Sequence, residues 1–179
     1  MFSHYGCPER FVYRPVNRLD KGTSGLMVIA RDGVSQHRLQ SLLHTEAFER
    51  VYLAVTLGAP EHDAGTIDLP IAKEDAASVR RVVRPDGKPS VTHYEVLQRS
   101  GNRALVRLRL ETGRTHQIRV HLAALGCPVF GDFLYGTESE ALPGRFALHS
   151  HLLTLRHPVT GDCLTLTSPL PDGLRRLLD

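Results

Sequence analysis

The chain contains 179 residues, of which 41% are hydrophobic, 23% charged and 6% aromatic, and its formal net charge is +3. These values are typical of a globular chain that can bury a core, and they exclude collagen-like, fibrous and wholly disordered proteins. No window approaches the roughly 18 consecutive apolar residues of a membrane span, and residues 1–14 lack the apolar centre of a signal peptide. We therefore expect a soluble, cytoplasmic protein.

The basic side chains and the cysteines add two further indications. Most of the 22 basic residues are arginines, whose planar guanidinium suits phosphate, although solvated surface charge accounts for any single arginine equally well. The three cysteines, Cys7, Cys127 and Cys163, are odd in number and show no CxxC spacing. The sequence therefore predicts free thiols, with neither a disulfide framework nor a zinc site.

Apolar spacing predicts three elements in the first third of the chain. Leu26–Ala30 is a short apolar run typical of a buried strand. Helical spacing over Val34–Phe48 predicts a helix, and Val51–Leu57 has the pattern of a strand. The pattern is then broken by Gly58, Pro60 and Gly65.

The middle of the chain has the period of two that antiparallel strands show. Apolar residues alternate with charged ones over residues 106–110, and Val91–Leu97 is also strand-like, so one sheet face is packed and the other wet. Before them, Ala76–Lys88 is basic and contains turn residues. This segment fits either a solvated hairpin tip or a contact with an RNA backbone.

The last third alternates between helix and strand signals. Helical spacing predicts a helix over Thr115–Leu125, and strands are expected at Phe146–Leu155 and Cys163–Thr167, with a short helix at Leu174–Leu178. The whole pattern predicts an α+β fold, mostly antiparallel sheet with flanking helices.

The stretch from Asn17 to Leu26 combines charge with a turn rich in glycine and hydroxyl groups. In extended backbone, Arg18 and Asp20 share one face. A carboxylate held at such a turn can act as a nucleophile or a base, with the arginine favouring its ionised form. A salt bridge that caps the loop explains the same pair without any catalysis.

A second stretch, Thr112–His121, opens the predicted helix of the last third. A helix start presents free N–H groups and a partial positive charge, which suits an anion. Arg114 and Arg119 are five residues apart, about 140° around a helix, so Arg119 can reach a carboxylate while Arg114 faces solvent or RNA. The same spacing of His116 and His121 argues against a metal site on one face.

These stretches follow one another in the same order as in the RluA family of RNA pseudouridine synthases. The chain resembles this family from about residue 17 to residue 169. The matching blocks are Arg18-Leu19-Asp20 with Thr23-Ser24-Gly25-Leu26, Tyr52-Leu53-Ala54, Thr112 to His121, Gly126-Cys127-Pro128 with Gly131-Asp132 and Tyr135-Gly136, and Leu148-His149 ahead of His157-Pro158. The resemblance implies the pseudouridine synthase catalytic-domain fold and the isomerisation of specific uridines in structured RNA, without a metal or an organic cofactor.

The resemblance also implies roles for individual residues. Asp20 falls on the catalytic aspartate, Tyr52 on the tyrosine that lies against the target base, and Arg119 on the basic residue that pairs with the aspartate. We expect Arg119 to hold Asp20 through a two-pronged, charge-assisted fork. Arg18 matches the arginine that enters the RNA when the uridine is turned out, and Leu148 the apolar pocket wall. Further RNA contacts are expected from Thr23, Arg114 and His116.

The chain departs from the family pattern at three places. Asn17 stands where the family usually has histidine, and Arg50 stands where lysine usually precedes the tyrosine by two residues. Only 16 residues precede Asn17, without the strand and Lys-Pro-x-Gly segment that members usually carry there. We expect residues 1–16 to be a short lead-in and residues 17–179 to form a single catalytic domain with no S4 domain, as in a truncated or reduced member.

Two functions of different classes remain open at this point. The first is an isomerase acting on ribosomal or transfer RNA, in which Asp20 either attacks C1′ of the ribose or removes a proton from C2′. The second is an RNA-binding module that keeps the fold and has lost turnover. A glycoside hydrolase is disfavoured because no second acid accompanies Asp20 in a comparable motif. Neither a membrane nor an obligatory protein partner is expected.

Overall fold

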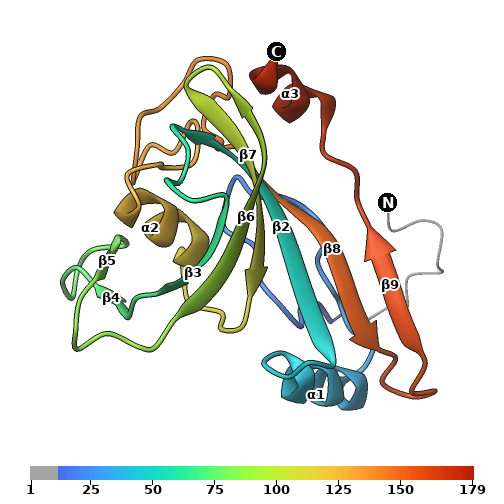
Figure 1. Ribbon diagram of the computed structural model, residues 1–179. Helices are drawn as coiled ribbons and strands as arrows, with labels where there is room; N and C mark the ends of the chain where they lie inside the picture. The colour runs from blue at the N-terminus through green and yellow to red at the C-terminus, as the bar shows by residue number, and fades with distance from the viewer. Residues whose placement is uncertain (1–11) are drawn as a thin grey trace.

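A computed structural model describes residues 12–179 and is dominated by one twisted sheet (Figure 1). Its strand order is β1-β8-β2-β7-β6-β3, and β9 pairs with β8 beyond the end of β1. All neighbouring strands are antiparallel except β1 and β8. The strands of this sheet are β1 (Ser24–Gly25), β2 (Phe48–Leu57), β3 (Ala64–Asp68), β6 (Val91–Ser100), β7 (Arg103–Leu110), β8 (Leu148–Arg156) and β9 (Cys163–Thr167).

Shorter elements surround the sheet. A separate hairpin is formed by β4 (Ile71–Lys73) and β5 (Arg81–Val83). The helices are α1 (Gly33–Leu42), α2 (Gln117–Ala124), α3 (Asp172–Arg175) and the 3-10 helix η2 (Arg176–Leu178). None of the helices within residues 12–179 has the length and hydropathy needed to cross a bilayer.

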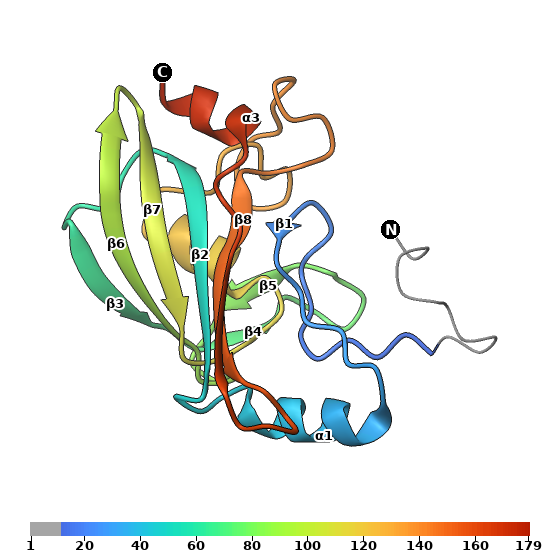
Figure 2. The ribbon, with the colours of Figure 1, turned by 90° about the vertical axis from the view of Figure 1, so that its right-hand side faces the viewer.

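Two helices are fixed to the sheet at different places. α1 begins at Asp32, whose carboxylate accepts the backbone N–H of Ser35 at 2.8 Å, and its buried Leu39 packs with Phe48 of β2 and Leu153 of β8. α2 lies beside β6, because His121 and Gln117 both hydrogen-bond to the buried Thr92 hydroxyl. Figure 2 shows α1 at the lower end of the sheet and α3 near the upper end.

The strands of the middle segment have the alternation that the sequence predicts. Ala104, Val106 and Leu108 of β7 are fully buried, whereas Arg107 and Arg109 between them are exposed. The main core collects these residues with apolar side chains of β2, α2 and the C-terminal helices. The predicted α+β class with a mostly antiparallel sheet is confirmed.

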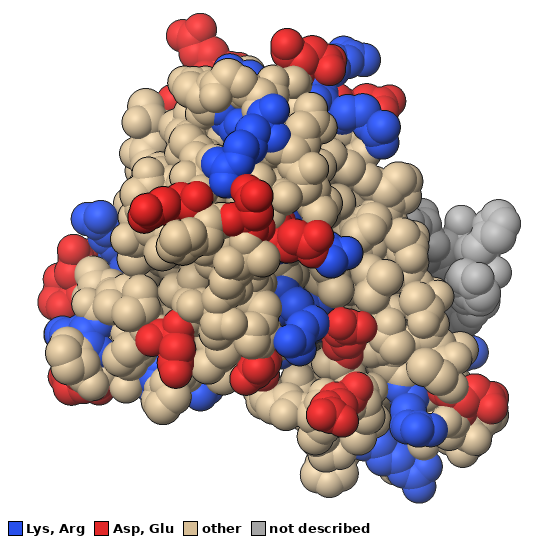
Figure 3. All heavy atoms as spheres, viewed as in Figure 1, with Lys and Arg blue, Asp and Glu red and all other residues tan. Residues whose placement is uncertain are grey.

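Charge is mixed on the face seen in Figure 3. Acidic and basic side chains are interspersed there, and no continuous basic patch covers the face. The net charge of +3 is therefore not concentrated on this side of the molecule. On this face, charge alone therefore indicates no preference for an anionic partner.

Two sequence predictions in the first third need correction. Leu26–Ala30 is not a sheet strand: β1 ends at Gly25, and the segment after it is irregular, bonded through Val28 and Ala30 to the chain near Val16 and Arg14. Leu26, Val28 and Ala30 pack with α1 and β8, whereas Met27 and Ile29 are exposed, so alternate residues of the run face the core although the segment does not join the sheet. The helix predicted to reach Phe48 ends at Leu42: residues 43–47 form turns, in which the Thr45 hydroxyl donates to the Leu42 carbonyl, and Phe48 is the first residue of β2.

Three short strands went unpredicted, and one prediction lies outside the described part of the chain. β3 contains Gly65, which the sequence pattern treats as a break, while β4 and β5 have three residues each. Cys127 is buried and Cys163 exposed, and both are free thiols as predicted. Cys7 and most of the short lead-in fall within residues 1–11, which are not described.

Gly25→Ala should destabilise the fold strongly, because a Cβ at this position would lie 2.1 Å from the Ser150 carbonyl oxygen of β8. Gly101→Ala is the matched control: Gly101 also has a positive φ, yet a Cβ there would meet nothing within 4 Å. We expect urea denaturation to show a loss of roughly 1 kcal/mol for Gly101→Ala and at least about 3 kcal/mol for Gly25→Ala. Equal losses would show that β1 does not depend on this close approach.

Candidate active site

One cavity collects every side chain that the sequence singled out. It has a volume of about 250 Å³ and lies between the segment before β1, the start of α2 and the inner face of β2. This volume is below the roughly 300–1,000 Å³ of sites for drug-sized ligands, so the cavity suits a smaller ligand. The predicted residues that line it are Arg18, Asp20, Thr23, Tyr52, Arg114, His116, Arg119 and Leu148.

A tight turn sets the position of Asp20. The Asp20 carbonyl accepts the Thr23 N–H at 2.9 Å, and Gly22 has a φ of +103°, as the third residue of a type II turn requires. A Cβ on Gly22 would lie 3.1 Å from the Phe146 ring, so the turn rests directly on that buried side chain. Asp20 is thereby held at the cavity, with 23% of its side chain exposed.

The parallel pairing of β1 with β8 fixes the chain just after this turn. Ser24 pairs with His149, and the Ser24 hydroxyl lies 2.9 Å from His149 Nδ1. His149 Nε2 lies 3.1 Å from the Ser168 carbonyl oxygen, which can only accept, so Nε2 carries the proton and Nδ1 accepts from Ser24. Burial, the main cause, lowers the pKa of His149 and favours this neutral form.

Tyr52 reaches the cavity from the centre of the sheet. It lies on β2, and the ladder between β2 and β8 shifts register between Val51 and Tyr52. The extra residue at this shift is His151 of β8, because Val51 pairs with Leu152 and Tyr52 with Ser150, whereas β2 itself pairs with β7 without interruption. Burial raises the pKa of Tyr52, and the Asp20 charge raises it further, while the Arg50 charge opposes the shift. The phenol is therefore protonated at neutral pH, with its ring set into the main core.

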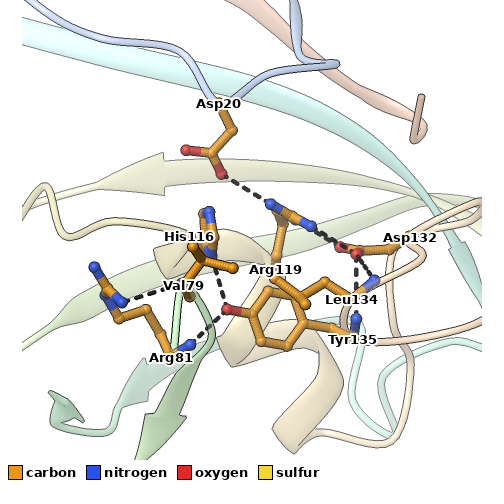
Figure 4. Close-up of polar contacts among 8 residues, drawn as sticks. All are labelled: Asp20, Val79, Arg81, His116, Arg119, Asp132, Leu134 and Tyr135. Atoms are coloured by element: carbon orange, nitrogen blue, oxygen red, sulfur yellow. Dashed lines mark hydrogen bonds and ion pairs between the residues drawn. The ribbon is translucent and has the colours of Figure 1, made fainter. Parts of the chain in front are cut away.

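Arg119 makes its fork with an aspartate other than the expected one. Its Nε donates to Asp132 Oδ2 at 2.6 Å and its Nη2 donates to Asp132 Oδ1 at 2.7 Å, whereas Nη1 lies 3.5 Å from Asp20 Oδ2 (Figure 4). The expectation that the fork grips Asp20 is wrong. Both side chains of the fork are buried, and Asp20 receives the one remaining arm of the guanidinium.

The guanidinium of Arg119 is also surrounded by aromatic rings. Its central carbon lies 4.2 Å from the centre of the Phe146 ring and 5.0 Å from that of Tyr135. Burial alone would lower the pKa of Arg119, but hydrogen bonding and charge from Asp132, together with Asp20, raise it overall. Arg119 is thus a fixed cation in the cavity wall.

His116 links the cavity to the β4–β5 hairpin. The Tyr135 hydroxyl accepts the backbone N–H of Arg81 at 2.8 Å and lies 2.8 Å from His116 Nδ1 (Figure 4). His116 has a φ of 59°, the only positive value of a residue other than glycine within residues 12–179. Burial lowers the pKa of His116 despite the opposing charge of Asp20, which favours a neutral ring. The basic Ala76–Lys88 segment is therefore tied to the site at Arg81.

The start of α2 differs from the anion site that the sequence indicated. The Gln117 side chain accepts the backbone N–H of Arg114 at 2.9 Å, so this donor is already used within the chain. The Arg114 side chain bonds to the Pro89 carbonyl and lines the cavity. His121 lies away from His116, buried between Thr92 and Leu69, which agrees with the argument against a shared metal site.

Sequence reasoning assigned no role to two residues that complete the site. Asp132 and Tyr135 fell within a matching block, but nothing in their spacing from Arg119 indicated a contact. Asp132 Oδ1 also accepts the backbone N–H groups of Leu134 and Tyr135, at 3.0 and 3.2 Å. One buried carboxylate therefore shapes the loop that carries Tyr135 and also holds Arg119. The glycine before it, Gly131, was the only local sign of a tight turn.

Comparison with solved structures places the fold in a known class of enzyme. The human RNA pseudouridylate synthase domain containing 4 is 31% identical to this chain, with a TM-score of 0.74, over 92% of this chain and 76% of its own. The structural class is therefore that of the pseudouridylate synthases.

Sequence comparison is more specific. The family model for RNA pseudouridylate synthase matches residues 4–124, which is more than half of the chain. The chain belongs to this family, and the resemblance drawn from the motif blocks is confirmed.

Relatives of the chain include longer proteins. An uncharacterized RNA pseudouridine synthase of Synechocystis sp. is 41% identical over 175 residues, which cover 93% of this chain and 53% of the relative. The ribosomal large subunit pseudouridine synthase D of Nitrosomonas europaea is 44% identical over 172 residues, with coverages of 91% and 49%. The chain thus spans about half the length of the curated relatives that it matches.

The neutral state of His149 makes stability depend on pH. Because burial lowers its pKa below the ordinary 6.5, the unfolded chain binds more protons than the folded chain once the pH falls through 6.5. The free energy of unfolding should therefore fall between pH 7.5 and pH 5, and it should fall less for His149→Gln, which cannot take up a proton. Urea denaturation at both pH values measures this, and an equal pH effect in the two proteins would contradict it.

Proposed function

We propose that this chain isomerises specific uridines to pseudouridine in structured RNA, either ribosomal or transfer RNA, with Asp20 as the catalytic carboxylate. The observation that carries the proposal is that Asp20 is the one carboxylate among the cavity-lining residues of the described chain. It is partly exposed, and its Oδ2 lies 3.5 Å from Nη1 of the fixed Arg119 cation.

The reaction requires the glycosidic bond between C1′ and N1 to break, the uracil to rotate, and a bond from C1′ to C5 to form. N1 then takes up a proton and C5 loses one, so the product is an isomer of the substrate. An ionised Asp20 can attack C1′ or remove the C2′ proton, and both routes remain open. Only Oδ2 of Asp20 contacts Arg119, which leaves Oδ1 without a hydrogen-bond partner within residues 12–179.

The cavity suits a uridine that has left its stack. Its small volume accepts a single base and ribose, and extruding a nucleotide costs a few kcal/mol that pocket contacts must return. We assign the flat ring of Tyr52 to stacking against the uracil and Leu148 to the apolar wall. Arg18, which is exposed at the cavity, is placed to occupy the gap in the RNA.

Contacts outside the base pocket are assigned to residues around the cavity mouth. Thr23, Arg114 and His116 line the same cavity and are proposed to touch the RNA. Lys73 and Arg81 of the β4–β5 hairpin, with Lys88 after it, line an adjoining cleft beside Arg114, together with one acid, Asp86. These cations suit a phosphate backbone, so we favour RNA contact over a free hairpin tip.

The proposal needs no metal, organic cofactor, membrane or obligatory protein partner, because a carboxylate and a fixed cation supply the chemistry described. It places the protein in the cytoplasm with its RNA substrate. We propose that residues 17–179 act as a single catalytic domain.

Tritium release from RNA labelled at C5 of uridine tests the proposal, since C5 loses its hydrogen in the reaction. We expect release by the wild-type chain on unmodified ribosomal or transfer RNA transcripts, and at least a ~1000-fold slower rate for Asp20→Asn, which removes the nucleophile or base. Asp63→Asn is the control: Asp63 is an exposed partner of Arg99 and does not line the cavity.

Two results would contradict the proposal in different ways. An Asp20→Asn protein with the wild-type rate would remove Asp20 from catalysis. RNA binding by the wild-type chain without tritium release would instead support the RNA-binding module without turnover.

A further inference from the structure

Arg50 is a buried cation for which the described chain provides no acidic partner. It lies on β2, two residues before Tyr52, so both side chains point from the same face of the strand into the cavity. Only 6% of Arg50 is exposed. No carboxylate within residues 12–179 lies within 4.0 Å of its guanidinium, whereas Arg119 on the opposite wall contacts two.

The hydrogen bonds of Arg50 are also incomplete. Nη2 donates to the Leu43 carbonyl oxygen at 3.2 Å, and this is its one bond to the described residues. Nε is buried and has no partner there. Burying a charge without a counter-ion costs several kcal/mol, so such groups are usually paired or bind a ligand. Burial accordingly lowers the pKa of Arg50, with only a small opposing effect from Tyr52.

The surroundings of Arg50 leave room for an anion and add positive charge. A Cβ on Gly113 would lie 2.9 Å from Arg50 Nη1 and 3.3 Å from the His44 ring, so the missing side chain lets the guanidinium approach. Arg114 follows Gly113 and lines the same end of the cavity. The charges of Arg50 and Arg114 both lower the pKa of His44, after burial as the main cause.

The cavity is therefore electrically asymmetric. One end holds Asp20 beside Arg119, and the other holds Arg50, Arg114 and His44 without an acid among the lining residues. A uridine within RNA has the same asymmetry, since its base and ribose are neutral and its charge lies on the flanking phosphates. The ribose carbon that reacts must face Asp20, which directs a flanking phosphate towards the other end.

We infer that Arg50, with Arg114 and His44 beside it, binds a phosphate that flanks the target uridine and so positions the ribose against Asp20. This inference rests on the proposed function for the identity of the ligand. Arg50 acts through binding and takes no part in bond breaking. Its planar donor set can hold two phosphate oxygens at once, which a lysine cannot do.

The salt dependence of RNA binding tests this inference. Each phosphate contact contributes about 0.7 to 0.9 to the slope of log affinity against log salt concentration. We expect Arg50→Gln to lower that slope by about this amount and to weaken binding of an unmodified ribosomal RNA transcript about tenfold at 0.1 M salt. Arg50→Lys retains the charge and should keep the wild-type slope while losing part of the affinity.

Arg99→Gln is the matched control. Arg99 is exposed on β6, bonds to Pro60 and Asp63, and does not line the cavity, so its loss should leave both slope and affinity unchanged. Thermal unfolding confirms that each variant is folded. If Arg50→Gln does not fold, Gly113→Ala takes its place, because the added Cβ displaces Nη1 without removing a charge from the unbound protein.

The slope of log affinity against log salt concentration decides whether Arg50 contacts a phosphate. A lower slope in Arg50→Gln, or in Gly113→Ala as its substitute, supports the phosphate site, and a wild-type slope overturns it. Binding is measured with Asp20→Asn added to every protein compared, so that no RNA is converted and the result is separable from the proposed function. A reduced slope in a chain that releases no tritium would retain the phosphate site and reject the isomerase. Tritium release by the wild-type chain, together with a wild-type slope for Arg50→Gln, would retain the isomerase and reject the phosphate site.

Discussion

The buried fork between Arg119 and Asp132 is the interaction on which the rest of the site depends. Two charges taken out of water rarely add net stability, but removing one of them leaves the other uncompensated, which is costly. The pair therefore works as a geometric constraint. Asp132 fixes the direction of the guanidinium and, through two backbone N–H groups, the loop that carries Tyr135. One arm of Arg119 is left for Asp20.

The sheet and the turns bring the partners of this pair together. The turn at Gly22 rests on Phe146, and the same ring packs against the Arg119 guanidinium, so one buried aromatic side chain supports both Arg119 and the turn that carries Asp20. The pairing of β1 with β8 holds the chain after the turn. Tyr52 and Arg50 of β2 line the cavity. Segments distant in sequence thus converge on one cavity of about 250 Å³.

Much of the fold was predictable because its signals are local. The alternation along β7 and the helical spacing of α2 follow from which residues face the core, whereas β9 was predicted from its pattern although all five of its residues are exposed. The segment after Gly25 was mispredicted because its alternate residues Leu26, Val28 and Ala30 pack against the core without the segment joining the sheet. Strands β3 to β5 are too short or too polar to give a period. The site residues were found because their motif blocks are contiguous, whereas the contact between Arg119 and Asp132 depends on tertiary packing that no spacing reveals.

The free energy of unfolding of Asp132→Asn, measured beside that of Asp20→Asn, tests most directly whether the fork organises the site. Asp132 is fully buried and bonded at 2.6 and 2.7 Å, so its neutralisation should cost about 3–5 kcal/mol. Asp20 is partly exposed and its contact is 3.5 Å, so its neutralisation should cost less than about 1 kcal/mol. Equal costs, or a larger cost for Asp20→Asn, would contradict the view that Arg119 is anchored by Asp132 and only lends an arm to Asp20.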